Sequence, residues 1–367
     1  MSVAEIEKTD PKSSRLDLID CDIHPAVMAS PAALYPYMST RWRNEFESIG
    51  PRVAQPFLRQ VPYPRLTPGN GMRGDAWPAG GGAPGSDLGL LQQQLLDTFD
   101  ISHGILVPLT PSTLNQGLCA AICSAVNEWQ IDRWTSHEPR LKASLCVTPD
   151  DPEAAVEEIR KHAGNRKFVQ ILVTPRTIEP IGRKRYRPLF EAAVEYGLPV
   201  ALHSDIGGKH ANSGAGWFSY YWEDHVAYTF SMQTMITSLI MEGVIDRLPD
   251  LKIVAIEGGF AWVPSLGWRL DKHWQRMRSE VPHVTLPPTE YMRQNFWYTT
   301  QPIEEPETPK HLQDTIRWIG ADRLLFSSDY PHWDFDDPRY AFKTKLSRAD
   351  EAAIFAGNAR RLYRLDQ

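Results

Sequence analysis

Four residues of the types that bind metal ions stand where short apolar segments of the chain end. Asp22 and His24 follow the first such segment, and a spacing of two places both side chains on one face of an extended chain. His203 ends a second apolar segment, and Asp329 lies in Ser-Ser-Asp-Tyr-Pro-His after a third. Singly, a strand-end histidine could be a hydrogen-bonded core residue and Asp329 a turn former. Jointly, two carboxylates and two imidazoles predict one divalent ion, with Zn²⁺ as the first choice and Mn²⁺ as the second.

The elements that must position these residues alternate between β-rich and helical segments along the chain. Several β-rich segments are apolar without alternation, as expected for strands of a parallel sheet buried on both faces. Eight strand–helix repeats predict an α/β protein with a (β/α)₈ TIM barrel, in which reactive groups lie at the carboxyl ends of the strands. The alternative is an open doubly wound sheet, but no Gly-x-Gly-x-x-Gly turn follows the first strand. The expected strands are Arg15–Cys21, Ser102–Val107, Leu141–Val147, Lys167–Val173, Leu198–Leu202, Leu251–Ile256, Phe296–Thr299 and Arg323–Phe326.

Helices are expected between these strands, each with one apolar face toward the sheet. Asp150 and Asp151 precede Pro152, which together predict a capped helix start at that point. The expected helices are Leu88–Phe99, Asn115–Trp134, Pro152–His162, Tyr186–Tyr196, Val226–Arg247, Val263–Met277, Lys310–Ile319 and Arg348–Tyr363.

The domain organisation is simple apart from one long insertion. Residues 1–15 form an N-terminal tail, and residues 16–367 form a single barrel domain. After the first strand, residues 51–86 contain seven prolines, seven glycines, and four arginines (Arg52, Arg59, Arg65 and Arg73) against one acid, Asp75. A loop this long is either a surface insertion or subunit-contact arm, or a lid over the barrel mouth that binds an anionic substrate.

Composition limits the partners and the compartment. The chain has 367 residues, 42% of them hydrophobic, which suits one large domain with a deep core. A net charge of −6 without a basic block argues against nucleic acid and anionic membranes as partners. The first 15 residues lack the apolar core of a signal peptide, and no apolar run is long enough to span a membrane. Four cysteines without disulfide or zinc-finger spacing favour a reducing compartment, so we expect a cytoplasmic protein.

The Asp-x-His motif, His203 and Ser-Asp-Tyr-Pro-His together resemble the amidohydrolase superfamily. The most similar branch is the amidohydrolase-related family 2 branch, which contains α-amino-β-carboxymuconate-ε-semialdehyde decarboxylase and γ-resorcylate decarboxylase. The resemblance extends over residues 16–363 and includes the segment Gly243–Val254. It implies that Asp22, His24, His203 and Asp329 bind one divalent metal, with Asp329 contacting the metal or its water.

Two departures from the family pattern concern the same site. Asp22 stands where the family often has His or Glu, and Glu257 of Glu-Gly-Gly stands where many members have His. Glu257 could therefore act as a base beside the metal, or only cap the N-terminus of the helix that follows. Lys167 lies at the start of its strand rather than at its end, so a bridged second metal is not expected.

Further candidates surround this set. His225 either enters the site as a catalytic residue or is a surface histidine in a capping segment, and His332 either orients substrate or supports Asp329. Arg269 either binds a substrate carboxylate or pairs with Asp271. The aromatic residues after the fifth strand either line a substrate pocket or form an interface: Trp217, Phe218, Tyr220, Tyr221 and Trp222.

These features predict a metal-dependent enzyme acting on a small carboxylic acid. The first hypothesis is a non-oxidative decarboxylase, a carbon–carbon lyase, of an aromatic or unsaturated acid, with Asp329 or Glu257 moving the proton. The alternatives are a hydrolase of an amide, lactone or C–C bond that uses metal-bound hydroxide, and an inactive barrel that binds a ligand. The insertion and the 12 tryptophans predict a homodimer or another even-numbered homo-oligomer, as does the family resemblance.

Overall fold

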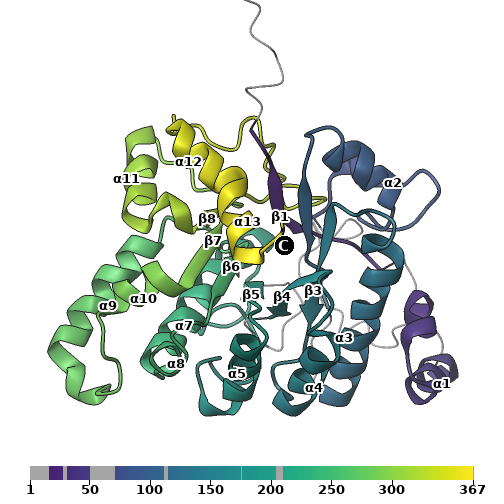
Figure 1. Ribbon diagram of the computed structural model, residues 1–367, viewed down its shortest axis with the longest axis horizontal. Coiled ribbons are helices and arrows are strands. Elements are labelled where there is room, and N and C mark those ends of the chain that lie inside the picture. Colours follow the sequence, from purple (N-terminus) through teal and green to yellow (C-terminus); the bar gives the residue numbers. More distant parts are fainter. Residues whose placement is uncertain are drawn as a thin grey trace, which may run out of the picture.

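Eight parallel strands form a single barrel with helices around it (Figure 1). The computed structural model describes residues 16–27, 31–49, 71–110, 115–174, 176–203 and 210–366. The strands pair in sequence order, and the barrel closes between the last and the first, where the Cys21 amide donates to the Phe326 carbonyl over 3.0 Å. The predicted TIM barrel is confirmed, and the open sheet is excluded. The strands are β1 Ile19–Ile23, β2 His103–Leu106, β3 Leu141–Cys146, β4 Phe168–Val173, β5 Val200–His203, β6 Ile253–Ile256, β7 Phe296–Thr299 and β8 Leu324–Leu325.

The helices lie outside the strands, and most of them follow the predicted order. None of the described helices combines the length and apolarity that a membrane crossing needs. They are α1 Thr40–Ile49, α2 Leu88–Leu91, α3 Gln116–Gln130, α4 Pro152–His162, α5 Arg187–Glu195, α6 Tyr221–Val226, α7 Tyr228–Met241, α8 Val244–Arg247, α9 Val263–Met277, α10 Pro288–Asn295, α11 Pro309–Ile319, α12 Arg348–Ala352 and α13 Asn358–Tyr363.

Two helices begin and end at the predicted residues because their starts carry strong local signals. Helix α4 begins with Pro152, and the Asp151 side chain accepts a hydrogen bond from the Ala154 amide over 3.1 Å. Helix α9 has Pro264 in its first turn. Proline is suited to the first turn, where its missing N–H has no partner to lose.

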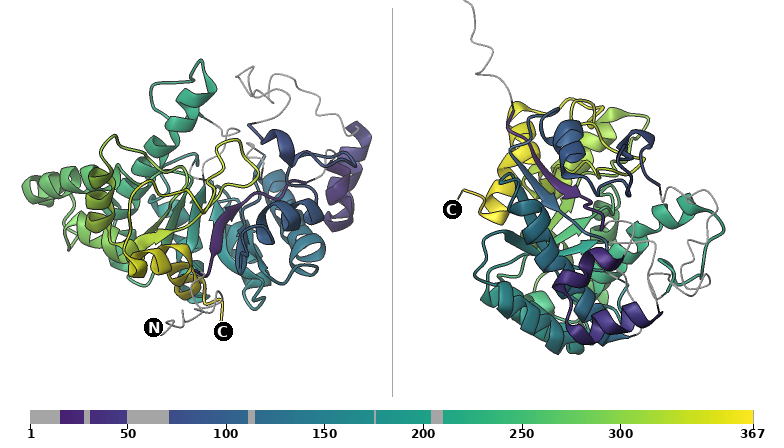
Figure 2. Two further views of the ribbon diagram at one scale, coloured as in Figure 1. Left: turned by 90° about the horizontal axis from the view of Figure 1, so that it is seen from above. Right: turned by 90° about the vertical axis from the view of Figure 1, so that its right-hand side faces the viewer.

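The single helix predicted over Val226–Arg247 is wrong, because this stretch contains two helices, α7 and α8, and the last residue of a third, α6. Gly243 separates α7 from α8 with a φ of +69°, a left-handed conformation that glycine adopts without strain. Helix α6 begins earlier than predicted, at Tyr221, and the segment that carries it stands out from the body of the barrel (Figure 2). The sequence analysis also missed α1 and α10.

The described half of the insertion packs beside the barrel mouth. The Arg73 amide donates to the Pro331 carbonyl over 2.9 Å, and the Ala26 amide donates to the Gly85 carbonyl over 2.8 Å. Gly85 has a φ of +80°, and a Cβ there would lie 2.3 Å from the His24 carbonyl oxygen, so no side chain fits. The Arg73 guanidinium pairs with Asp75 over 2.6 Å. Residues 71–86 thus support the loops after β1 and β8, while Arg52, Arg59 and Arg65 lie outside the described residues.

Candidate metal centre

The barrel mouth brings together the four predicted metal ligands. In β1, Ile19, Cys21 and Ile23 pack in a hydrophobic cluster, so Asp20 and Asp22 point to the opposite face, into the barrel. His24 Nε2 lies 3.2 Å from Asp22 Oδ1 and 2.8 Å from Asp329 Oδ1. His203 Nε2 lies 3.8 Å from Asp22 Oδ2. All four side chains are almost completely buried.

The hydrogen bonds of these side chains leave ligand atoms directed into a shared space. His24 Nδ1 lies 2.7 Å from the Val107 carbonyl oxygen, which can only accept, so Nδ1 carries the proton and Nε2 carries a lone pair. Within the described chain, both carboxylate oxygens of Asp22, His24 Nε2 and His203 Nε2 are buried without a hydrogen-bond partner. Buried polar atoms are normally satisfied, and one divalent cation would satisfy all of these together.

The electrostatics of the site agree with a place for a cation. Burial raises the pKa of both Asp22 and Asp329 to about 7. Burial lowers the pKa of His24 to about 4. Burial also disfavours the charged form of His203, but Asp22 and Glu257 outweigh it and raise its pKa to about 9. The metal-free cluster therefore holds protons that a bound cation would displace.

Asp20, which the sequence analysis did not single out, connects the end of β1 to the loop after β8, and these two segments carry three of the candidate metal ligands. Its carboxylate accepts hydrogen bonds from the Ser328 amide (3.0 Å), the Ser328 hydroxyl (2.5 Å) and the Asp22 amide (3.1 Å). The Asp329 amide donates to the Asp22 carbonyl over 3.1 Å. These contacts fix the start of the β8 loop against β1, so Asp329 reaches the same space as Asp22.

His332 forms a close contact with the Asp329 carboxylate. Its Nδ1 lies 2.6 Å from Asp329 Oδ1, and its ring centroid lies 4.5 Å from that of His24. Burial lowers the pKa of His332, but Asp329 offsets this effect and the pKa rises to about 9. An imidazolium at this position stabilises the ionised form of Asp329, which is the form that binds a cation.

Glu257 lies at the edge of the metal-binding space and joins two histidines. Its Oε2 is 3.0 Å from His203 Nε2, and its Oε1 is 3.3 Å from His225 Nε2. Burial raises the pKa of Glu257, but both histidines outweigh it and hold the pKa well below its usual range. Glu257 is therefore an ionised carboxylate with a φ of +54°, a strained backbone conformation of the kind that clusters at functional sites.

The alternative in which Glu257 only caps the next helix is wrong. The amides of Phe260 and Ala261, just before α9, both donate to Glu304 Oε2 over 3.1 Å. Glu304 comes from the loop after β7, so a different carboxylate has the structural role.

His225 enters the site instead of lying on the surface. It is 11% exposed, and its Nε2 lies 3.1 Å from Asp334 Oδ2 in addition to its contact with Glu257. Asp334 and Gln301 were both missed by the sequence analysis. Gln301 follows β7 by two residues, so the rule that reactive groups lie at strand ends would have found it. Asp334 lies in an acid-rich loop, which was the one signal available for it.

Several predicted substrate-binding residues are not brought to this cluster. Arg269 lies on the exposed side of α9. No ion pair joins it to Asp271 in the described chain, and Asp271 accepts hydrogen bonds from Thr289 instead. Trp217 and Trp222 are 57% and 63% exposed, so they do not close a pocket. Tyr221 does reach the site region: its ring lies 5.7 Å from that of His225, and its hydroxyl accepts a hydrogen bond from Trp333.

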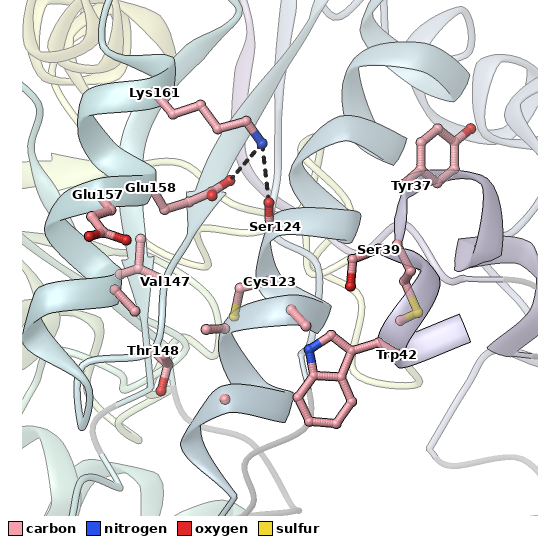
Figure 3. Close-up of a pocket in the computed structure, with 15 residues that line it drawn as sticks. Tyr37, Ser39, Trp42, Cys123, Ser124, Val147, Thr148, Glu157, Glu158 and Lys161 are labelled. Atoms are coloured by element: carbon pink, nitrogen blue, oxygen red, sulfur yellow. Dashed lines mark hydrogen bonds and ion pairs between the residues drawn. The ribbon is translucent and has the colours of Figure 1, made fainter. Parts of the chain in front are cut away.

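A cavity of about 430 Å³ lies elsewhere, between the segment that contains Trp42 and helices α3 and α4 (Figure 3). Lys161 bridges Ser124 and Glu158 at one end. The cavity also contacts Cys123, and burial raises the pKa of this thiol to about 12, so the thiol is inert as a nucleophile. The described lining contains no pair of imidazoles, and we place the chemistry at the barrel mouth.

Comparisons with known proteins identify relatives of similar sequence and fold. The chain is 27% identical over 311 residues to a γ-resorcylate decarboxylase of Rhizobium sp. (strain MTP-10005), a match that covers 78% of this chain and 93% of the relative. The crystal structure of 2,6-dihydroxybenzoate decarboxylase complexed with 2,6-dihydroxybenzoate superposes with a TM-score of 0.70 at 20% identity, over 95% of this chain and 99% of that one.

The fold is also shared with 5-carboxyvanillate decarboxylase of Novosphingobium aromaticivorans, solved with manganese and 4-hydroxy-3-methoxy-5-nitrobenzoic acid. That structure has a TM-score of 0.68 at 18% identity and covers 99% of this chain and 100% of its own. The amidohydrolase family description matches residues 19–365, which is nearly the whole described barrel. The prediction of a metal-dependent enzyme of this superfamily is thereby confirmed, and the chain belongs to the amidohydrolase family.

Proposed function

We propose that the protein is a non-oxidative decarboxylase of a small aromatic carboxylic acid that carries a hydroxyl group beside the carboxylate. The observation that carries the proposal is a pair of overlapping groups of possible metal ligands at the barrel mouth, Asp22–His24–His203 and His24–Asp329–His332, with buried unsatisfied atoms on Asp22, His24 and His203. The relatives support an ortho-hydroxylated aromatic acid as the substrate, since they include decarboxylases of 2,6-dihydroxybenzoate and 5-carboxyvanillate.

The roles of the residues follow from their positions. When bound by Asp22, His24, His203 and Asp329, a divalent cation supplies the positive charge that attracts and orients an anionic substrate. The carbon that loses its carboxylate must gain a proton, and Glu257 and Asp329 are two of the carboxylates that face this space. His332 and Asp20 hold the loop of Asp329 in place.

The cation is Mn²⁺ or Zn²⁺. Two carboxylates beside two imidazoles suit both ions, and solved relatives contain manganese. The four cysteines are free and buried, which suits the cytoplasmic location that we propose.

The function is tested with purified protein loaded with each metal in turn. We expect CO₂ release from 2,6-dihydroxybenzoate or 5-carboxyvanillate, with one phenolic product per CO₂, and loss of both metal and turnover in His203→Ala. Protein with stoichiometric metal that releases no CO₂ from a panel of ortho-hydroxybenzoates would contradict the proposal. Protein that retains no metal at all would favour an inactive barrel.

A further inference from the structure

A second cavity, of about 360 Å³, lies at the amino-terminal end of the barrel. Its walls come from the end of α5, from the residues that lead into β5, β6 and β7, and from Arg364, which follows α13. Lys252 immediately precedes β6 and Glu257 immediately follows it, so this cavity and the metal-binding space lie at opposite ends of the same strand. A ligand in this cavity is therefore not the substrate of the metal centre.

Two positively charged side chains of this cavity, Lys252 and Arg364, have no partner of opposite charge. Among the residues that the structure describes, neither side chain forms an ion pair or a hydrogen bond. Burial and the Arg364 guanidinium lower the pKa of Lys252, and Asp250, the one acid of the described lining, offsets this effect only in part. The chain has 45 acids against 39 lysines and arginines, so a general excess of positive charge does not explain this pair. An anion between the two cations would remove their mutual repulsion.

The backbone around the cavity holds both cations in place. Arg364 has a φ of +53°, in the left-handed region that residues with a side chain seldom adopt. Its guanidinium lies over Gly197, where a Cβ would be 3.2 Å from Nη1 and 3.4 Å from Nη2. The Asn295 side chain donates to the Leu251 carbonyl over 2.9 Å, which fixes the segment that carries Lys252.

The rest of the lining favours an organic ligand over a free ion. Val194, Leu198 and Trp297 are partly exposed apolar side chains on the cavity wall. The Arg323 guanidinium covers the Trp297 ring at 4.6 Å from its centroid and so holds the ring in place. The volume falls within the range of small-molecule pockets, which begins at about 300 Å³.

We propose that this cavity binds a small organic phosphate, namely a phosphate monoester with an apolar or aromatic group. Such a group carries a charge of about −1.5 to −2 at pH 7, which matches the two cations. The planar guanidinium of Arg364 suits two phosphate oxygens, and Lys252 supplies a point charge. The apolar wall contacts the organic group. The inference does not depend on the proposed function, since no residue of this cavity belongs to the metal centre.

Isothermal titration of the zinc-loaded protein with phenyl phosphate tests the site. We expect saturable binding that is about tenfold tighter than that of inorganic phosphate, because only the ester covers the apolar wall. Lys252→Met and Arg364→Met should each weaken the binding of phenyl phosphate about tenfold or more, since each removes a charged donor to the phosphate.

Three controls separate this site from other causes of binding or of its loss. Lys310→Met changes a lysine outside the cavity, which pairs with Asp314 on α11, and should bind phenyl phosphate as the parent does. His203→Ala removes a candidate metal ligand and should keep the binding, which distinguishes the cavity from the metal centre. Lys252→Met and Arg364→Met should melt within about 2 °C of the parent, because no described ion pair is lost.

Three results would overturn the inference. The first is the absence of saturable binding of phenyl phosphate at millimolar concentrations. The second is binding that survives both Lys252→Met and Arg364→Met or disappears in His203→Ala, since the ligand would then lie outside this cavity. The third is equal affinity for phenyl phosphate and inorganic phosphate, which would exclude a phosphate monoester as the ligand.

Discussion

Metal affinity at this site should rise steeply with pH. Metal ligands bind in their deprotonated form, so each proton held by the metal-free cluster must leave when the cation binds. At pH 7 the metal-free protein holds about half a proton on Asp22, half on Asp329 and one on His203, given pKa values of about 7, 7 and 9. About two protons are released, which makes the affinity rise on the order of a hundredfold per pH unit near pH 7.

The slope has a definite sign and limits. Below pH 7 both aspartates hold more of their protons, so affinity falls more steeply toward pH 6. Above pH 9 the affinity levels off, because His203 is then neutral.

Competition with a chromophoric chelator, corrected for the chelator's own protonation, measures this affinity between pH 6 and pH 8. Calorimetry in two buffers of different ionisation enthalpy counts the released protons directly. Asp22→Asn removes one titrating ligand and should lower both the affinity and the proton count. An affinity that changes less than tenfold between pH 6 and pH 8 would refute the reasoning.

Three further predictions concern single features of the chain. Glu257→Gln should lower turnover of an ortho-hydroxybenzoate about a hundredfold or more with the melting temperature nearly unchanged; turnover within a few fold of the parent would make Glu257 a scaffold residue. Glu304→Ala should destabilise the fold by about 1–3 kcal/mol, because the amides of Phe260 and Ala261 lose their acceptor; an unchanged urea midpoint would contradict this. The exposed Trp217, Tyr220 and Trp222 and the long insertion favour a homodimer, and light scattering that gives the monomer mass of 41.6 kDa at micromolar concentration would exclude it.

The barrel could be predicted from the sequence because its strands are buried on both faces. Runs such as Ile253–Ile256 are apolar at every position, and each is followed by a helical pattern. Helix ends were predictable where proline or an aspartate cap marks them, as at Pro152. The break between α7 and α8 was missed because Gly243 lies within an otherwise continuous helical pattern.

The site was predictable in part, for a different reason. Asp22 and His203 lie at the ends of β1 and β5, and His24 and Asp329 follow β1 and β8. Barrel geometry alone brings such residues to one end. The positions of His225 and Asp334 depend on how the long loops after β5 and β8 fold against each other, held by the contact between Trp333 and Tyr221. No periodicity encodes such a contact, so their pairing appears only in three dimensions.

The left-handed backbone at Glu257 has a consequence for how this site could change over evolutionary time. With φ at +54°, the position disfavours β-branched and bulky residues, whereas histidine is among the types that enter this region more readily. The family resemblance implies that many members have histidine at the corresponding place. An exchange between glutamate and histidine could thus occur by substitution of one residue while the main chain keeps its path. The backbone of the turn after β6 then accepts either residue. A family can therefore replace an imidazole by a carboxylate at this position, and alter its proton chemistry, while the barrel stays the same.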